Sequence, residues 1–275
     1  MLKRILAHNI CDFDMPQKNI SPEKIAQEIG RDIEPIEIVS EGAPVNLQDT
    51  MIVSSDEEFL KKYSDKGYAV LAVSSQNKYF DGIKYVTWDI LDCNHKYLNE
   101  IFCRQRSIPV KILETERTLV VETSKTDLDA MYELYDDDEV RRFVEPLYGR
   151  KEEEDYLQKY IEGMYEFYGY GMWSVFSKDG RLVGKIGLNN RNVDGEVCVE
   201  LGYIVHKAFR RIGLAKEVCH GILKYAKEQL GMSKVYILTE KDNMASVRVA
   251  ISMGFEELEP IVIEEKIHRR FCKRI

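Results

Sequence analysis

The segment from Glu200 to Leu230 constrains the fold of this chain most strongly. A strand pattern ending at Val205 runs into a short loop with the spacing Arg210-x-x-Gly213-x-Ala215, and a helical pattern follows. Such a loop aims backbone N–H groups at one point beside the positive end of the helix dipole, an arrangement that binds diphosphates. Gly213 lets the backbone approach a ligand closely, and Ala215 keeps the first helical turn free of bulk. Taken alone, the same spacing also fits an ordinary helix start.

The patterns on either side of this segment predict an ordered series of elements. In chain order we expect a strand at 114–122, helices at 127–135 and 152–167, a hairpin of strands at 172–176 and 182–188, a strand at 197–205, a helix at 217–230, a strand at 235–239, a helix after Asn243 and a last strand at 266–275. The last strand is expected to present a basic, solvated face.

The first part of the chain alternates strands and helices at shorter intervals. A helix signal at Ser21-Pro22-Glu23 is followed by a strand pattern at 51–53, a helical pattern at 56–66 and a continuous apolar run at 68–73. A strand at 84–88 and a helix at 94–104 extend the same alternation. A run of this kind, buried on both faces, is typical of a parallel sheet. We therefore predict two domains: residues 1–113 as a small layered α/β domain of unknown role, and residues 114–275 as a separate α+β unit.

Charge and composition exclude several classes of partner. The chain carries a formal charge of −8 over 275 residues, and both predicted domains are acidic. This balance disfavours nucleic acid and suits cationic small molecules. The six cysteines are scattered, no signal peptide is evident, and no apolar run approaches the roughly 20 residues of a membrane span. We expect a cytoplasmic protein without a membrane partner, and a homo-oligomer is compatible with the sequence.

A second block of residues adds to the loop motif. It reads Asn243-x-x-Ser246-x-x-Val249 and ends in Gly254-Phe255. Together with the loop and the order of elements, it makes residues 114–275 resemble the GNAT family of acetyl-CoA-dependent N-acetyltransferases, and most of all the branch of ribosomal-protein alanine and spermidine acetyltransferases. The resemblance implies the GNAT acyl-CoA N-acyltransferase fold, a mixed and mostly antiparallel sheet flanked by helices.

The resemblance also implies where acetyl-CoA, the expected co-substrate, binds. The backbone at Tyr203, Ile204 and Val205 would face the pantetheine arm and the developing oxyanion. The diphosphate would lie on the loop and the first helical turn, formed by Arg210, Arg211, Ile212, Gly213, Leu214, Ala215 and Lys216. Asn243, Ser246 and Val249 would complete the cofactor site. Arg211 stands where glycine is frequent in the family.

Two residues are candidates for proton transfer. Glu200, on the strand that leads to the loop, is the candidate base for the ammonium of the acceptor, although a strand glutamate also commonly faces solvent or pairs with a basic neighbour. Many family members carry a tyrosine four residues before the Gly-Phe glycine, where this chain has Ala250. Ser246 is the candidate substitute acid, and its alternative roles are an N-cap or a hydroxyl bonded within the helix.

Other patterns carry weaker hypotheses. His206 and His220 are too far apart for a helical metal pair. The remaining histidines, His8, His95 and His268, have no cysteine or carboxylate at ligand spacing, so no metal site is predicted. Residues 50–90 are similar to part of a haloacid-dehalogenase-like domain, and Asp12-Phe-Asp14 imitates its catalytic pair, but Met15-Pro16 replaces the expected Gly-Thr. We favour a degenerate scaffold or a partner-binding domain.

The resemblance predicts an N-acetyltransferase that transfers acetyl to a primary amine by direct attack, the acceptor being a protein or peptide N-terminus, a polyamine or another small amine. The alternative is a catalytically impaired GNAT-like module that binds acyl-CoA or mediates assembly. Ala250 and the additional first domain motivate that alternative.

Overall fold

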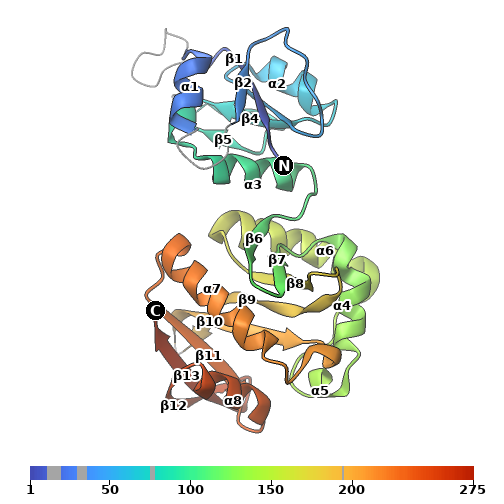
Figure 1. Cartoon of the computed structure of the whole chain (residues 1–275), viewed down its shortest axis with the longest axis vertical. Coiled ribbons are helices and arrows are strands. Elements are labelled where there is room, and N and C mark those ends of the chain that lie inside the picture. Colours follow the sequence, from blue (N-terminus) through green and yellow to red (C-terminus); the bar gives the residue numbers. More distant parts are fainter. Residues whose placement is uncertain (11–19, 30–35, 75–77, 194) are drawn as a thin grey trace. The chain divides into compact units, whose positions relative to one another are not determined.

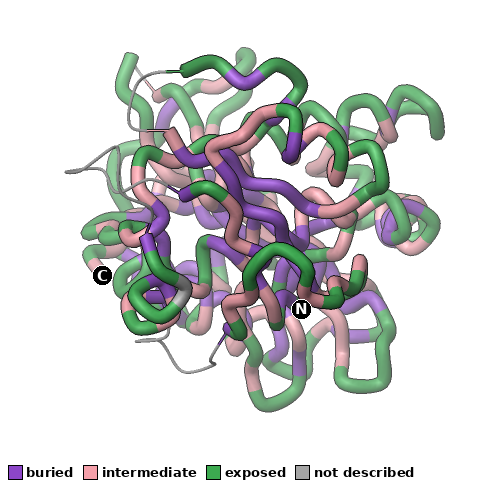
Figure 2. Tube along the Cα trace, turned by 90° about the horizontal axis from the view of Figure 1, so that it is seen from above, coloured by how far each residue is buried: buried purple, intermediate pink, exposed green. Residues whose placement is uncertain are grey.

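The computed structural model describes residues 1–10, 20–29, 36–74, 78–193 and 195–275. The chain forms two compact units, Met1–Val110 and Lys111–Ile275. Buried residues, purple in Figure 2, come from strands and helices of both units. Among the described residues no helix is long and apolar enough to cross a membrane.

The first unit is a five-stranded parallel sheet with helices (Figure 1). Its strand order is β2-β1-β3-β4-β5. The strands are β1 Arg4–His8, β2 Glu37–Val39, β3 Thr50–Ser54, β4 Ala69–Val73 and β5 Val86–Thr87, and the helices are α1 Pro22–Ile29, α2 Glu57–Ser64 and α3 His95–Gln105, with a 3-10 turn at Ile90–Asp92. Every residue of β3 and β4 is buried, as the continuous apolar runs predict.

Sequence and structure agree on the helices of this unit in physical detail. The backbone N–H of Lys24 donates to the Ser21 hydroxyl before α1, and Asp56 caps α2 by accepting from the N–H of Phe59. The strand expected at 84–88 is reduced to the two residues of β5. The haloacid-dehalogenase-like interpretation stays a prediction, and its Asp12 and Asp14 lie outside the described residues.

The second unit is an eight-stranded mixed sheet with the order β12-β13-β11-β10-β9-β8-β7-β6. Its strands are β6 Lys111–Glu114, β7 Thr118–Val121, β8 Met172–Ser177, β9 Leu182–Val193, β10 Glu196–Val205, β11 Lys234–Glu240, β12 Glu256–Ile263 and β13 Lys266–Arg274. Neighbouring strands are antiparallel except β10 and β11, which are parallel. The mixed, mostly antiparallel sheet predicted from the sequence is thus confirmed.

Helices flank this sheet (Figure 1). They are α4 Leu128–Tyr135, α5 Asp138–Arg141, α6 Arg150–Tyr160, α7 Leu214–Leu230 and α8 Met244–Ser252, with 3-10 turns at Lys125–Asp127 and Lys207–Phe209. The buried face of α7, which includes Val218, Ile222 and Ala226, packs in one core with Trp173 and Ile186.

Two helix predictions for this unit are wrong in part, and one strand was not predicted. The helix expected at 152–167 changes to a π-helical turn at Ile161–Glu166, and α7 begins three residues earlier than its predicted start. The sequence analysis missed β12. Because β12 pairs with β13, the last strand lies between β11 and β12.

Candidate active site

Strands β10 and β11 are neighbours in the sheet but are hardly paired. We call the boundary between these two strands the seam. The ladder between these strands consists of one residue pair, Glu200 with Tyr236, although every residue of both strands is described. On its other side β10 pairs with β9 along its whole length, and β11 pairs with β13 from Lys234 to Glu240. The two strands therefore diverge beyond Glu200 and leave backbone groups of β10 without ladder partners across the seam.

The chain passes from β10 into the loop that starts α7. Arg211 and Gly213 both adopt left-handed backbone conformations, with φ of 63° and 82°. Gly213 occupies the N-cap position of α7, and no side chain of that cap accepts from the helix. The N–H groups of Leu214, Ala215 and Lys216 have no acceptor within the helix, because the first helical bond runs from Glu217 to Gly213. Such a terminus can bind an anionic group.

Side chains at this turn divide into buried and solvent-facing groups. Leu214 is buried in the core and fixes the start of the helix. Arg211, Ile212 and Lys216 are exposed, and Ala215 is half-buried. Leu214 thus anchors the turn in the core, while the outer surface of the turn stays accessible to solvent.

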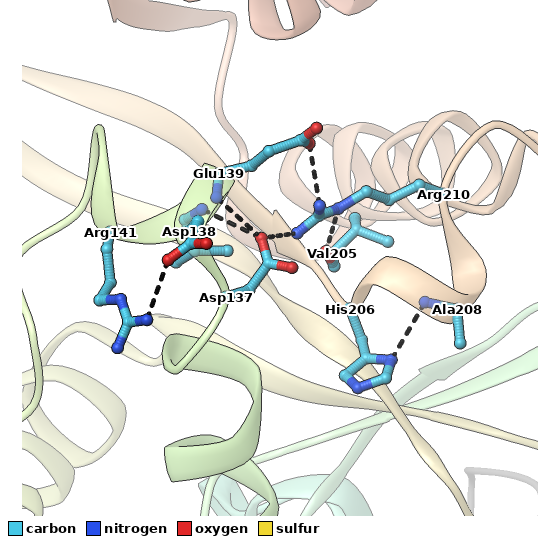
Figure 3. A network of polar contacts seen from close by, with 9 residues as sticks. Asp137, Asp138, Glu139, Arg141, Val205, His206, Ala208 and Arg210 are labelled. Atoms are coloured by element: carbon cyan, nitrogen blue, oxygen red, sulfur yellow. Dashed lines mark hydrogen bonds and ion pairs between the residues drawn. The ribbon is translucent and has the colours of Figure 1, made fainter.

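The Arg210 side chain is committed to protein groups (Figure 3). Its Nε donates to the carbonyl of Val205 at 2.9 Å, and its terminal nitrogens contact Asp137 at 2.8 Å and Glu139 at 2.9 Å. The Asp137 carboxylate also caps α5, accepting from the N–H groups of Glu139 and Val140. The Arg210 guanidinium, the largest influence, and these N–H groups hold the pKa of Asp137 below its ordinary value. The side chain of Arg210 therefore ties the loop to α5.

Arg117 also contacts the loop, and it was not predicted from the sequence to do so. Its Nη1 donates to the carbonyl of Ile212 at 3.0 Å, and its Nε contacts Glu217 at 2.6 Å. Burial acts to raise the pKa of Glu217, but hydrogen bonds from Thr115 and Arg117 outweigh it and lower the pKa. The carboxylate in the first turn of α7 is thereby neutralised by an arginine.

Glu200 pairs with a basic neighbour across the β9–β10 hairpin. Its Oε2 accepts from the Nε of Arg191 at 2.8 Å. The Glu200 side chain is 12% exposed and that of Arg191 51%. Burial acts to lower the pKa of Arg191, but Glu200 outweighs it and keeps the pKa raised. The carboxylate is sheltered yet reachable, and it lies on the residue pair at which the seam opens.

The second motif meets β10 through Tyr203. Asn243 caps α8 by accepting from the N–H of Ser246 at 3.1 Å, so the cap is Asn243 and not Ser246. The Ser246 hydroxyl lies 2.8 Å from the hydroxyl of Tyr203, which also donates to the Ser246 carbonyl at 3.1 Å. Burial raises the pKa of Tyr203. Ala250 is fully buried.

The remaining predicted residues lie around the same seam. Tyr203, Val205 and Val249 pack at the margin of the main core, and Ile204 packs against the cluster that contains Met131 and Leu182. The Tyr203–Ser246 contact brings the start of α8 to β10, and the loop before α7 follows β10 in the chain.

A small cavity of about 10 Å³ lies under α6, room for about one water. Lys185 and the buried Glu153 line it with several tyrosines, among them Tyr160. Burial lowers the pKa of Lys185, and Glu153 opposes the shift. The lysine Nζ stands 5.9 Å from the centre of the Tyr160 ring. Sequence reasoning missed this group, because its members are separated by other elements.

Comparison with known proteins gives a consistent set of matches. A family model described as an acetyltransferase (GNAT) domain matches residues 117–256. The uncharacterized N-acetyltransferase YoaA of Bacillus subtilis is 28% identical over 149 residues, which are 53% of this chain and 83% of that protein.

Among solved structures, RimL, a ribosomal L7/L12 alpha-N-protein acetyltransferase, aligns with a TM-score of 0.52 at 13% identity over 61% of this chain and 96% of its own. The same protein in complex with coenzyme A aligns with a TM-score of 0.50 at 14% identity, over 61% and 98% of the two chains. At this identity the likeness concerns the fold.

Proposed function

This chain belongs to the GNAT family of acetyltransferases, and from that premise we propose that its second unit transfers an acetyl group from acetyl-CoA to a primary amine. The observation that carries the proposal is the uncapped N-terminus of α7, which directly follows the strand that diverges from β11. An anionic diphosphate suits the free N–H groups of the helix, and an extended amide-bearing arm suits the unpaired backbone of β10.

The chain's own residues suggest how each part would be held. The N–H groups from Arg211 to Lys216 would bind the diphosphate. The backbone of β10 from Tyr203 to Val205 would bind the pantetheine arm. Arg117 would counter the charge of Glu217, which otherwise would repel phosphate from the first turn. Arg210 would act by positioning the loop, since its donors already serve Asp137 and Glu139.

Proton transfer would start at Glu200. An alkyl amine is mostly ammonium at neutral pH, so a base has to accept a proton before the nitrogen can attack a thioester carbonyl. Glu200 is a carboxylate that stands where the seam opens, and Arg191 holds it in place through one oxygen. The amine would lose its proton to this carboxylate directly or through a water.

The leaving thiolate would be protonated by the pair formed by Tyr203 and Ser246. Burial raises the pKa of Tyr203, so its hydroxyl keeps its proton throughout the neutral range and can act as a donor. The pair replaces the tyrosine that many family members carry where this chain has the buried Ala250. Sequence reasoning named Ser246 for this role and named Tyr203 for its backbone alone.

The acceptor is proposed to be a primary amine. RimL acts on a ribosomal protein N-terminus by its description, and we extend that class of acceptor to this chain together with polyamines and other small amines. Ala250 motivates the alternative, a binding module without turnover.

A titration and a release assay separate the two functions. We expect acetyl-CoA to bind the full chain in isothermal titration calorimetry, and free CoA to appear when N-terminal peptides, polyamines or aminoglycosides are added. Binding without CoA release across the panel would favour the binding module. No heat of binding at high micromolar acetyl-CoA would contradict both.

Replacing the proposed acids should lower turnover modestly. We expect Ser246→Ala and Tyr203→Phe each to reduce kcat by about tenfold, because a thiolate is a stable leaving group that needs little help. The loss should not shrink at high pH, because these groups act on the leaving thiolate and not on the substrate amine. Steady-state pH profiles measure this, and Tyr170→Phe, which removes a hydroxyl bonded to Asn190, is the matched control. Unchanged kcat in both variants would exclude the pair from the reaction.

A further inference from the structure

The first unit contains a hollow at the carboxyl ends of two parallel strands. Ser74 follows β4 and Trp88 follows β5, and both line a cavity of about 400 Å³ together with residues of the connecting loop. This volume lies in the range of small-molecule sites, about 300–1,000 Å³. In open α/β sheets, ligands bind outside the carboxyl ends of the strands. The hollow thus has the size of a small-molecule site and lies at the carboxyl edge of the sheet, although the topological switch point is between β1 and β3.

Exposed aromatic groups form its walls. Tyr79 is 80% exposed and Trp88 54%, whereas Phe80 beside them is buried in the core of the unit. Val86 of β5 is also exposed. Large apolar groups gathered at a concave surface commonly mark a binding site. Two accessible aromatic faces in one hollow suit a planar ring that stacks on them.

Two lysines lie at the hollow, and one of them contacts a carboxylate. Lys78 and Lys84 both line it. The Nζ of Lys78 stands 4.6 Å from the centre of the Phe80 ring and 3.9 Å from a carboxylate oxygen of Glu57, so it is held at the rim. In a chain with a net charge of −8, lysines gathered with aromatic groups in a cavity indicate an anionic ligand.

We propose that this hollow binds a nucleotide, with the base stacked against Tyr79 and Trp88 and the phosphate held by Lys78 and Lys84. A planar ring joined to an anion is the ligand that satisfies both sets of groups. The hollow belongs to the first unit and is independent of the acetyltransferase proposal.

Trp88 provides a direct reporter. The chain has two tryptophans, and Trp173 is fully buried in the second unit. AMP is titrated into the full chain while tryptophan fluorescence is followed, without CoA, because the adenine nucleotide of CoA would itself compete for the hollow. We expect saturable quenching with a Kd below about 1 mM. The same titration of Trp88→Phe corrects for absorption by AMP and should show no saturable quenching.

Variants then test the two halves of the site. Tyr79→Ala and Lys84→Ala should each weaken AMP binding about tenfold, whereas Tyr97→Ala and Lys62→Ala, at exposed positions of α3 and α2, should leave it unchanged. Adenosine and inorganic phosphate alone should each bind more weakly than AMP.

Three results would overturn the proposal: no saturable quenching up to about 5 mM AMP, equal binding of adenosine and AMP, or equal losses in the site and control variants. Circular dichroism of each variant shows whether it is folded, so that a loss of binding is not mistaken for unfolding.

Discussion

Glu200→Gln is expected to lower kcat/KM by about 10²–10⁴-fold near pH 7. Glutamine keeps the shape of the side chain and can still bond Arg191, but it no longer accepts a proton from an ammonium. The sign of the pH dependence follows: as pH rises, a larger share of the acceptor is free amine, so the variant should recover part of its activity. Affinity for acetyl-CoA should barely change, because the carboxylate is assigned to the amine.

Two further variants separate proton transfer from the ion pair. Glu196→Gln changes an exposed carboxylate on the same strand and should leave kcat/KM unchanged. Arg191→Met removes the 2.8 Å contact and keeps the carboxylate, so most of the activity should remain. Steady-state rates between about pH 6 and 10 measure all three. If Arg191→Met and Glu200→Gln lose activity equally and independently of pH, the pair is structural and Glu200 is not the base.

Gly213→Val is expected to weaken acetyl-CoA binding tenfold or more, equivalent to about 1.4 kcal/mol. The reason lies in the backbone. Gly213 has a φ of 82°, which a β-branched residue rarely adopts, whereas a Cβ there would meet its nearest neighbour, Arg117, only at 3.7 Å. The substitution should therefore change the direction of the N–H groups at the start of α7 rather than cause a clash.

The matched control for this variant is Gly180→Val. Gly180 also has a φ of 82° and no atom within 4 Å of its expected Cβ, but it lies in the β8–β9 turn. Both variants should lose a similar amount of stability, about 1–2 kcal/mol, and binding should weaken in Gly213→Val alone. Calorimetric titration and thermal unfolding measure both quantities. Unchanged affinity in a folded Gly213 variant would remove the loop from the cofactor site.

The local parts of the site could be predicted from the sequence, and its long-range contacts could not. The turn before α7 could be predicted from Gly213 and Ala215, because these residues determine the backbone conformation only of their near neighbours in the chain. The partners of Arg210 are Asp137 and Glu139, more than 70 residues away in the chain. From the sequence alone, an arginine in a loop that resembles a phosphate-binding loop suggests an anionic ligand. Only the fold shows that two carboxylates of the protein are its partners.

The difference between local and long-range interactions also explains which elements of the fold were predicted incorrectly. β12 has acidic residues and Pro260 among its apolar ones, and only Ile261 is buried, so no alternation marks it as a strand. Its partner β13 supplies the missing backbone hydrogen bonds. The π-helical turn Ile161–Glu166 has the apolar spacing of an ordinary helix and cannot be distinguished from one by pattern.

Under the proposed function, the single residue pair between β10 and β11 links the stability of the folded chain to the supply of acetyl-CoA. Because the ladder consists of one residue pair, backbone hydrogen bonds stabilise the sheet little across that seam. A molecule that occupies it stabilises the folded state by mass action, by about 2.7 kcal/mol when its free concentration is 100 times its Kd. Under the proposed function, cells rich in acetyl-CoA would therefore retain more of this protein against proteolysis than starved cells, with no change in its synthesis.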